Sequence, residues 1–115
     1  MSDPTPGVPL KPVDYLVLLA LHERDRHGYG IVKDIERLSE GQVRLVPGYL
    51  YAVISRLVDG GLVREAPGRD RRGSRRRIYR LTPPGRRVLA AETRRLEGLL
   101  ARPETARVLR GASRS

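Results

Sequence analysis

Arginine is concentrated in one part of this 115-residue sequence. Between Arg64 and Arg95 there are twelve arginines and three acidic residues, a local net charge of +9 within a total of +10. A bias toward arginine explains why Lys11 and Lys33 are the only lysines, but it does not explain this concentration. A dense basic surface attracts polyanions, because each neutralised phosphate releases condensed counterions. The charge pattern therefore predicts binding to a nucleic acid.

Five of these arginines surround a short glycine-containing segment between two stretches of strand character. They are Arg69, Arg71, Arg72, Arg75 and Arg76. A run of charge is usually a solvated face, but a basic loop beside a DNA-contacting helix favours phosphate or minor-groove contact. Gly68, Gly73 and Ser74 allow the segment to bend toward a groove. We therefore expect the five arginines to contact DNA.

A second group of residues lies at the starts of two predicted helices. In the helix that begins at Pro47-Gly48, a buried stripe is formed by Leu50, Val53, Ile54 and Leu57. Falling largely outside that stripe are Gly48, Tyr49, Tyr51, Ser55 and Arg56. An α-helix fits the major groove with its N-terminal residues nearest the base edges, so these five are expected to contact DNA. Tyr29 and Gly30 begin the preceding helix, whose free N–H groups can hold a phosphate.

Apolar periodicity predicts the elements that position these residues. Helices are expected over residues 12–23, 28–39, 47–59 and 83–102, the last with Thr82 as its N-cap. The segments Leu62–Ala66 and Arg77–Leu81 are expected to pair as strands around a basic loop over residues 67–76. Residues 24–28 are expected to form a polar turn.

These elements predict a mainly α fold with a small β-hairpin. Residues 12–82 are expected to form a winged helix-turn-helix domain, and residues 83–102 a C-terminal dimerisation helix. Residues 1–11, which contain Pro4, Pro6 and Pro9, are expected to be a flexible N-terminal arm. Residues 103–115 are expected to be a flexible tail with at most one helical turn.

Several spaced motifs resemble those of one family, the phenolic-acid-responsive PadR regulators. The motifs are Leu18-Leu19-Ala20-Leu21, His27-Gly28-Tyr29-Gly30, Pro47-Gly48-Tyr49-Leu50-Tyr51, Arg56-Leu57, Gly61-Leu62-Val63, Arg75-Arg76-Arg77-Ile78-Tyr79-Arg80-Leu81-Thr82 and Gly85. The resemblance implies a transcriptional regulator that binds double-stranded DNA. It places Tyr51 at a helix-packing position, which is the alternative to a DNA contact for this residue. Tyr49 replaces the threonine that is usual in the family, so the base contact there is expected to differ.

The resemblance also implies pairing of two copies through the last helix and the first. The predicted dimerisation residues are Tyr15, Leu16, Leu19, Leu89, Leu96, Leu99 and Leu100, of which the last four form a seam with near-heptad spacing. A two-fold dimer matches a palindromic operator, so the implied function is that of a homodimeric repressor. Release by a small aromatic or drug-like effector is left open, because the last helix has no tryptophan with which some relatives stack flat drugs.

Two other classes of function account for less of the sequence. A basic RNA- or ribosome-associated module explains the charge but not the helix start Pro47–Tyr51 followed by a hairpin. RNA-binding proteins also tend to present exposed aromatic side chains for stacking, and Phe and Trp are absent here. An enzyme is not expected, because the sequence has no nucleophile elbow, phosphate-binding loop or paired-carboxylate motif.

No metal, cofactor or membrane anchor is expected. His22 and His27 without any cysteine are a poor metal site, so His27 is expected to form a local hydrogen bond at a helix start. No apolar run approaches the ~20 residues of a membrane-spanning helix, and no export signal is evident. A soluble cytoplasmic protein is therefore expected.

Overall fold

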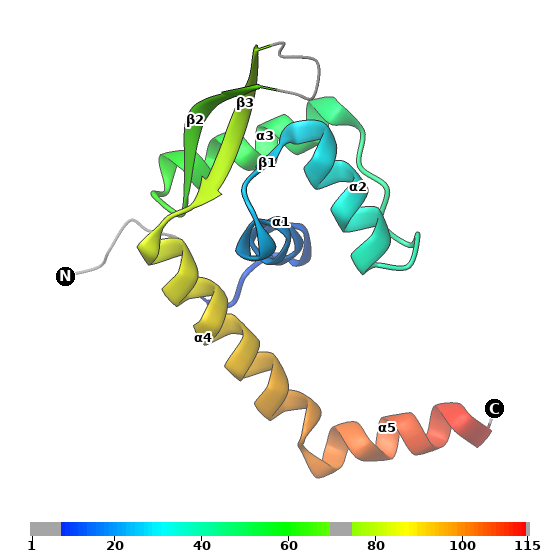
Figure 1. Ribbon diagram of the computed structural model, residues 1–115. Helices are drawn as coiled ribbons and strands as arrows, with labels where there is room; N and C mark the ends of the chain where they lie inside the picture. The colour runs from blue at the N-terminus through cyan, green and yellow to red at the C-terminus, as the bar shows by residue number, and fades with distance from the viewer. Residues whose placement is uncertain (1–7, 70–74, 115) are drawn as a thin grey trace.

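Five helices and a small sheet make up the fold in the computed structural model, which describes residues 8–69 and 75–114 (Figure 1). The helices are α1 (Pro12–Glu23), α2 (Gly28–Leu38), α3 (Pro47–Asp59), α4 (Pro83–Leu100) and α5 (Pro103–Arg114). The strands are β1 (Arg26–His27), β2 (Val63–Arg69) and β3 (Arg75–Leu81), which form an antiparallel sheet in the order β1-β3-β2. The predicted mainly α fold with a small β-hairpin is confirmed.

The first three helices pack around one core because each presents an apolar stripe to the other two. Their fully buried side chains are Val17, Leu18, Ile31, Ile35, Leu50, Val53 and Leu57. Leu62, Tyr79 and Leu81 from the hairpin close the core on the side of the sheet. This packing fixes the positions of α2, α3 and the hairpin relative to one another.

Local hydrogen bonds fix where the helices begin and end. His27 caps α2 by accepting the Gly30 N–H at its Nδ1 atom (3.1 Å), as the predicted local role of His27 requires. Thr82 caps α4 by accepting the Gly85 N–H (3.0 Å), so the predicted N-cap is confirmed. Helix α3 ends at Gly60 and Gly61, and Gly61 has a φ of +79°, which favours glycine.

The hairpin is longer than predicted. Its register pairs Val63 with Leu81 at the base and Arg69 with Arg75 toward the tip. Arg69, Arg75 and Arg76 therefore belong to strands, and their assignment to a loop over residues 67–76 is wrong. The antiparallel ladder continues past Pro67, with Gly68 opposite Arg76. A side chain on Gly68 would collide with that of Ile78, so glycine suits this position. Arg71 and Arg72 lie outside the described residues.

The predicted polar turn over residues 24–28 is also wrong in part, because Arg26 and His27 form strand β1. They pair with Tyr79 and Ile78 of β3. The Arg26 guanidinium also binds the buried Asp34 carboxylate on α2 (Nε–Oδ2 3.0 Å). The short strand thus joins the hairpin to the start of α2.

The N-terminal segment is attached to α4, so the prediction of a flexible arm over residues 1–11 is wrong for Leu10. Its side chain is buried, and its N–H donates to Glu92 Oε2 (3.0 Å). Arg95 binds both oxygens of the same carboxylate (2.6 and 2.9 Å). The hydrogen bonds from Arg95, and to a lesser degree that from Leu10, hold the pKa of Glu92 below its usual range. The carboxylate that binds the N-terminal segment therefore stays ionised. Residues 1–7 lie outside the described part of the chain.

The C-terminal segment forms helix α5, so the prediction of a flexible tail with at most one helical turn is wrong. Pro103 suits the first turn of a helix, and Glu104 places an acidic group near the positive end of the helix dipole. The Thr105 hydroxyl donates to Leu99 O (2.7 Å) and ties α5 to the end of α4. In Figure 1, α4 leads away from the hairpin and α5 continues in a new direction. Among residues 8–69 and 75–114 no helix is long and apolar enough to cross a membrane.

Candidate nucleic-acid interface

Helices α2 and α3 begin on the side of the molecule that also carries the hairpin (Figure 1). Four large side chains are exposed there. Their exposed fractions are 67% for Val46, 56% for Tyr29, 51% for Tyr49 and 47% for Tyr51. Aromatic and branched side chains are normally buried, and several of them exposed together mark a contact surface. We call this set the α2–α3 face.

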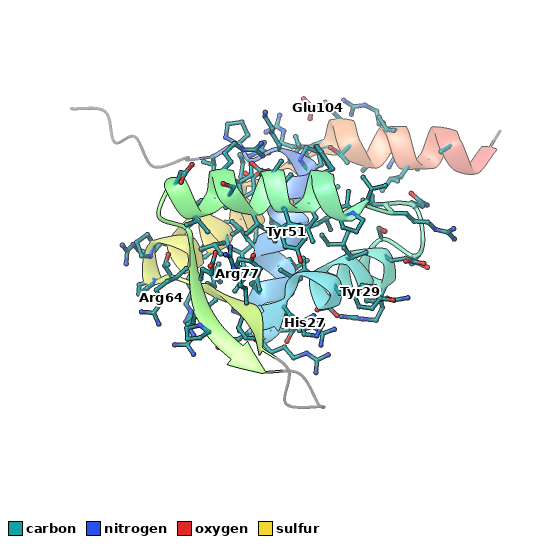
Figure 2. The ribbon with its side chains drawn as sticks, turned by 90° about the horizontal axis from the view of Figure 1, so that it is seen from above. His27, Tyr29, Tyr51, Arg64, Arg77 and Glu104 are labelled. Atoms are coloured by element: carbon teal, nitrogen blue, oxygen red, sulfur yellow. The ribbon has the colours of Figure 1, made fainter. Side chains whose placement is uncertain are left out.

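A pocket of about 410 Å³ opens beside this face, between the start of α2, the side of α3 and strand β3. It is lined by His27, Gly28, Tyr29, Tyr51, Arg77 and Tyr79, and Figure 2 shows the labelled members gathered there. A side chain on Gly28 would meet the end of the Tyr51 ring, because its Cβ would lie 2.5 Å from the Tyr51 hydroxyl oxygen. Tyr51 therefore packs against α2 with one end while half of its surface stays open, which agrees with the helix-packing alternative for this residue.

Arg77 supplies the positive charge of this pocket. It was not among the residues that the sequence singled out, because it was assigned to a strand rather than to the basic loop. Successive strand residues point to opposite faces, so Arg77 shares a face with the buried Tyr79, and this spacing was the available signal. Arg77 pairs with Glu65 across the hairpin (Nε–Oε1 3.3 Å), and its side chain remains 75% exposed. Burial raises the pKa of the Tyr79 phenol, which therefore stays neutral.

Part of the arginine-rich charge is used within the chain. Arg77 binds Glu65, Arg80 binds Asp25 and Arg95 binds Glu92. The first two pairs are exposed, and such pairs contribute little to stability and are weakened by salt. Both guanidinium groups therefore remain able to bind a phosphate. Arg69, Arg75 and Arg76 belong to the strands of the same hairpin.

Gly30 is not available as a phosphate donor in this arrangement. Its N–H is bonded to His27, the residue itself is buried, and the Arg26 guanidinium lies against it. The prediction of a DNA contact at Gly30 is therefore not supported, whereas Tyr29, which has Lys33 Nζ 5.4 Å from its ring centre, is open to solvent. In the part of the chain that is described, no group of three His, Asp or Glu side chains is placed to hold a metal ion.

Arg56 binds a partner in its own chain. Its guanidinium donates to the carboxylate of Asp14, which is buried in the first turn of α1. The Arg56 side chain is 45% exposed, against 7% for Asp14. An unpaired carboxylate so deeply buried would be costly, so Arg56 holds α3 on α1. The DNA contact expected of its exposed part stays a prediction.

Gly48 and Ser55 lie on the exposed side of α3, as predicted. A Cβ on Gly48 would meet no heavy atom within 4 Å. Glycine lowers helix stability, and nothing in the packing of this chain requires it at this position. The absence of a side chain leaves the first turn of α3 open to the close approach of a partner.

The predicted dimerisation residues are divided between the core and the surface. Leu89 is buried in the core of its own chain, so its assignment to the surface seam is wrong. The Tyr15 hydroxyl is hydrogen-bonded to Thr93 Oγ1 (2.8 Å), which joins α1 to α4. Leu16, Leu19 and Leu96 are partly buried, while the most exposed members are Leu99 and Leu100.

A largely apolar groove of about 550 Å³ lies between α1 and α4. It is lined by Leu19, His22, Arg86, Leu89, Ala90, Thr93 and Arg94. In Figure 1, α4 runs to the side of α1 that faces away from the hairpin. The groove therefore lies apart from the α2–α3 face.

Comparison with known proteins matches residues 17–91 to the Transcriptional regulator PadR-like family. A transcriptional regulator of Mycobacterium tuberculosis is 38% identical over 78 residues, which cover 67% of this chain and 68% of the relative. A solved transcriptional regulator from Clostridium thermocellum has a TM-score of 0.66 at 28% identity, covering 76% of this chain and 85% of that one. Bacillus subtilis PadR in complex with operator DNA has a TM-score of 0.62 at 19% identity, covering 72% and 47%, which shows a common fold.

Proposed function

Because the chain belongs to the PadR-like family of transcriptional regulators, we propose that it represses transcription by binding a palindromic operator as a homodimer. The observation that carries this proposal is the exposed α2–α3 face with the Arg77 pocket beside it. Family membership confirms the resemblance found in the sequence and places the chain among regulators rather than enzymes. A cytoplasmic location, where bacterial DNA lies, is part of the proposal.

The proposed docking inserts the start of α3 into the major groove. Helices of this motif contact bases with their N-terminal residues while the preceding helix contacts the backbone. Tyr29 and Arg77 are then beside the same strand of phosphates, and the basic hairpin meets the neighbouring backbone. Bacillus subtilis PadR, which has the same fold, was solved with operator DNA. The placement of the α3 start beside a basic hairpin suits the grooves of duplex DNA, which favours DNA over the RNA- or ribosome-associated alternative.

The proposed dimer forms through α4 and α1. Leu99 and Leu100 expose apolar surface that a second copy would cover, and the α1–α4 groove offers a complementary depression. Leu89 lines this groove but is only 4% exposed, so it offers little surface to a second copy. The small aromatic or drug-like effector suggested by the resemblance stays a prediction.

Selection of duplexes from a random-sequence pool by the full-length protein tests this proposal. We expect enrichment of one inverted repeat whose half-sites lie about 10 base pairs or a multiple of this apart, because each chain of a two-fold dimer presents one α3. Sedimentation of the complex should give two chains per duplex. Enrichment of no sequence would contradict DNA recognition, and one chain on a single half-site would contradict the dimer.

A further inference from the structure

The exposed side of α3 has an unusual chemistry for a helix that contacts bases. Its exposed residues are Val46 at the N-cap, Pro47, Gly48, Tyr49, Tyr51, Ala52, Ser55, Arg56 and Asp59. From Val46 to Asp59 there is no lysine, asparagine or glutamine. The single arginine of the helix, Arg56, is bound to Asp14. The N-terminal end of α3 therefore presents mainly apolar and aromatic side chains to a partner.

This composition limits which base edges α3 can recognise. Guanine is most often bound by arginine or lysine, and adenine by asparagine or glutamine, through paired hydrogen bonds in the major groove. Thymine differs from the other bases by a methyl group in the same groove, which apolar side chains contact. Van der Waals contact with that methyl group is the chemistry that the start of α3 can supply.

Val46 and Tyr49 are the side chains placed to make such contacts. Val46 is the most exposed large side chain of the helix start, and Tyr49 follows it one helical turn later with half of its surface open. Gly48 belongs to the same first turn and has no side chain there, and a Cβ at this position would meet nothing within 4 Å. Tyr51 is excluded, because the end of its ring lies against Gly28.

We propose that α3 selects its operator through contact of Val46 and Tyr49 with thymine methyl groups, rather than through charged or amide hydrogen bonds to purines. The inference rests on the proposed function, since it requires that α3 enter the major groove. It identifies the bases recognised at that site and the two residues that recognise them.

Replacement of single thymines by deoxyuridine tests this inference, because it removes one methyl group and leaves every hydrogen bond in place. The full-length protein is titrated with the selected duplex and with versions that carry a single deoxyuridine in one of the two half-sites. At one or two positions per half-site we expect affinity to fall about fourfold, which corresponds to about 0.8 kcal/mol for one buried carbon. No loss of twofold or more at any thymine would overturn the inference.

Two variants locate the effect on α3. In Val46→Ala/Tyr49→Ala the thymine and deoxyuridine duplexes should bind equally, because the side chains that contact the methyl group are gone. In Tyr29→Ala, which removes a similarly exposed tyrosine from α2, binding to both duplexes should weaken while the fourfold difference remains. If Val46→Ala/Tyr49→Ala still binds the duplex and still prefers thymine over deoxyuridine fourfold, the inference is overturned. Failure of the proposed function would instead appear earlier, as a selection that enriches no duplex, and would reject the inference as well.

Discussion

Replacing Gly85 with alanine is expected to lower the free energy of unfolding by about 2–3 kcal/mol, the upper part of the range for a side chain forced into a closely packed site. Gly85 lies in the first turn of α4, against the backbone at the start of β2. An added Cβ would lie 2.1 Å from the carbonyl oxygen of Leu62 and 2.9 Å from Leu81 Cδ1. The oxygen belongs to the backbone and also accepts the Thr82 N–H, so it cannot move without disturbing the junction of hairpin and α4.

Urea unfolding at one fixed protein concentration measures this effect, because the stability of a dimer depends on concentration. Gly98→Ala is the matched control: Gly98 lies on the same helix, and its added Cβ would meet nothing within 4 Å. The control should equal or exceed the wild type in stability, since alanine favours helix. A Gly85→Ala protein within about 0.5 kcal/mol of the wild type would show that this junction is not closely packed.

Replacing Arg56 with alanine is expected to lower the free energy of unfolding by about 2 kcal/mol, because it leaves Asp14 buried without its charged partner. The loss is smaller than for a fully buried pair, because the Arg56 side chain is 45% exposed. The double variant Asp14→Ala/Arg56→Ala should be no less stable than Arg56→Ala alone, which is the pattern of two residues that act through each other.

Chemical unfolding of the wild type, Asp14→Ala, Arg56→Ala and the double variant gives the interaction free energy between the two residues. Ser55→Ala serves as the control, because Ser55 is the exposed neighbour of Arg56 on α3, and its stability should stay within about 0.5 kcal/mol of the wild type. If Arg56 were instead a DNA contact, as its position outside the apolar stripe suggested, its loss would weaken DNA binding with no effect on stability.

The main helices could be predicted because their signals are local. Pro47 opens α3, Gly60 and Gly61 close it, and the apolar stripe between them has the helical period. Strand β1 could not be predicted in the same way. Arg26 and His27 have no strand pattern of their own, and they become a strand only because the fold brings them beside Tyr79 and Ile78.

Helix α5 was missed for a related reason. The run Ala101-Arg102-Pro103 was interpreted as the end of the preceding helix, which ends at Leu100. A proline in the first turn, however, also begins the next helix. The segment after it has no long apolar stripe, and Val108 and Leu109 remain exposed in the folded chain. With so few apolar residues, the segment had too short an apolar stripe for a helix to be predicted from it.

The candidate site was predicted at the level of elements but not of individual partners. Periodicity placed Arg56 and Leu89 on the correct helices, yet it could not show that Asp14 binds one and that the core buries the other. Arg77 was missed because its importance comes from a pocket built by α2, α3 and β3 together. Contacts between residues far apart in sequence decide which exposed residues are free to bind a ligand.

The claim that the start of α3 enters the major groove of DNA is tested most directly by comparing two variants. The measurement is the DNA affinity of Gly48→Ala and of its control, Gly111→Ala. Both glycines lie on exposed helix surface where an added Cβ meets nothing within 4 Å, so both variants should be at least as stable as the wild type. We expect Gly48→Ala to bind the selected duplex about tenfold more weakly, because its methyl group intrudes into a close-packed contact, while Gly111→Ala on α5 binds as the wild type does. Equal binding by wild type and both variants would contradict the insertion of α3 into the major groove.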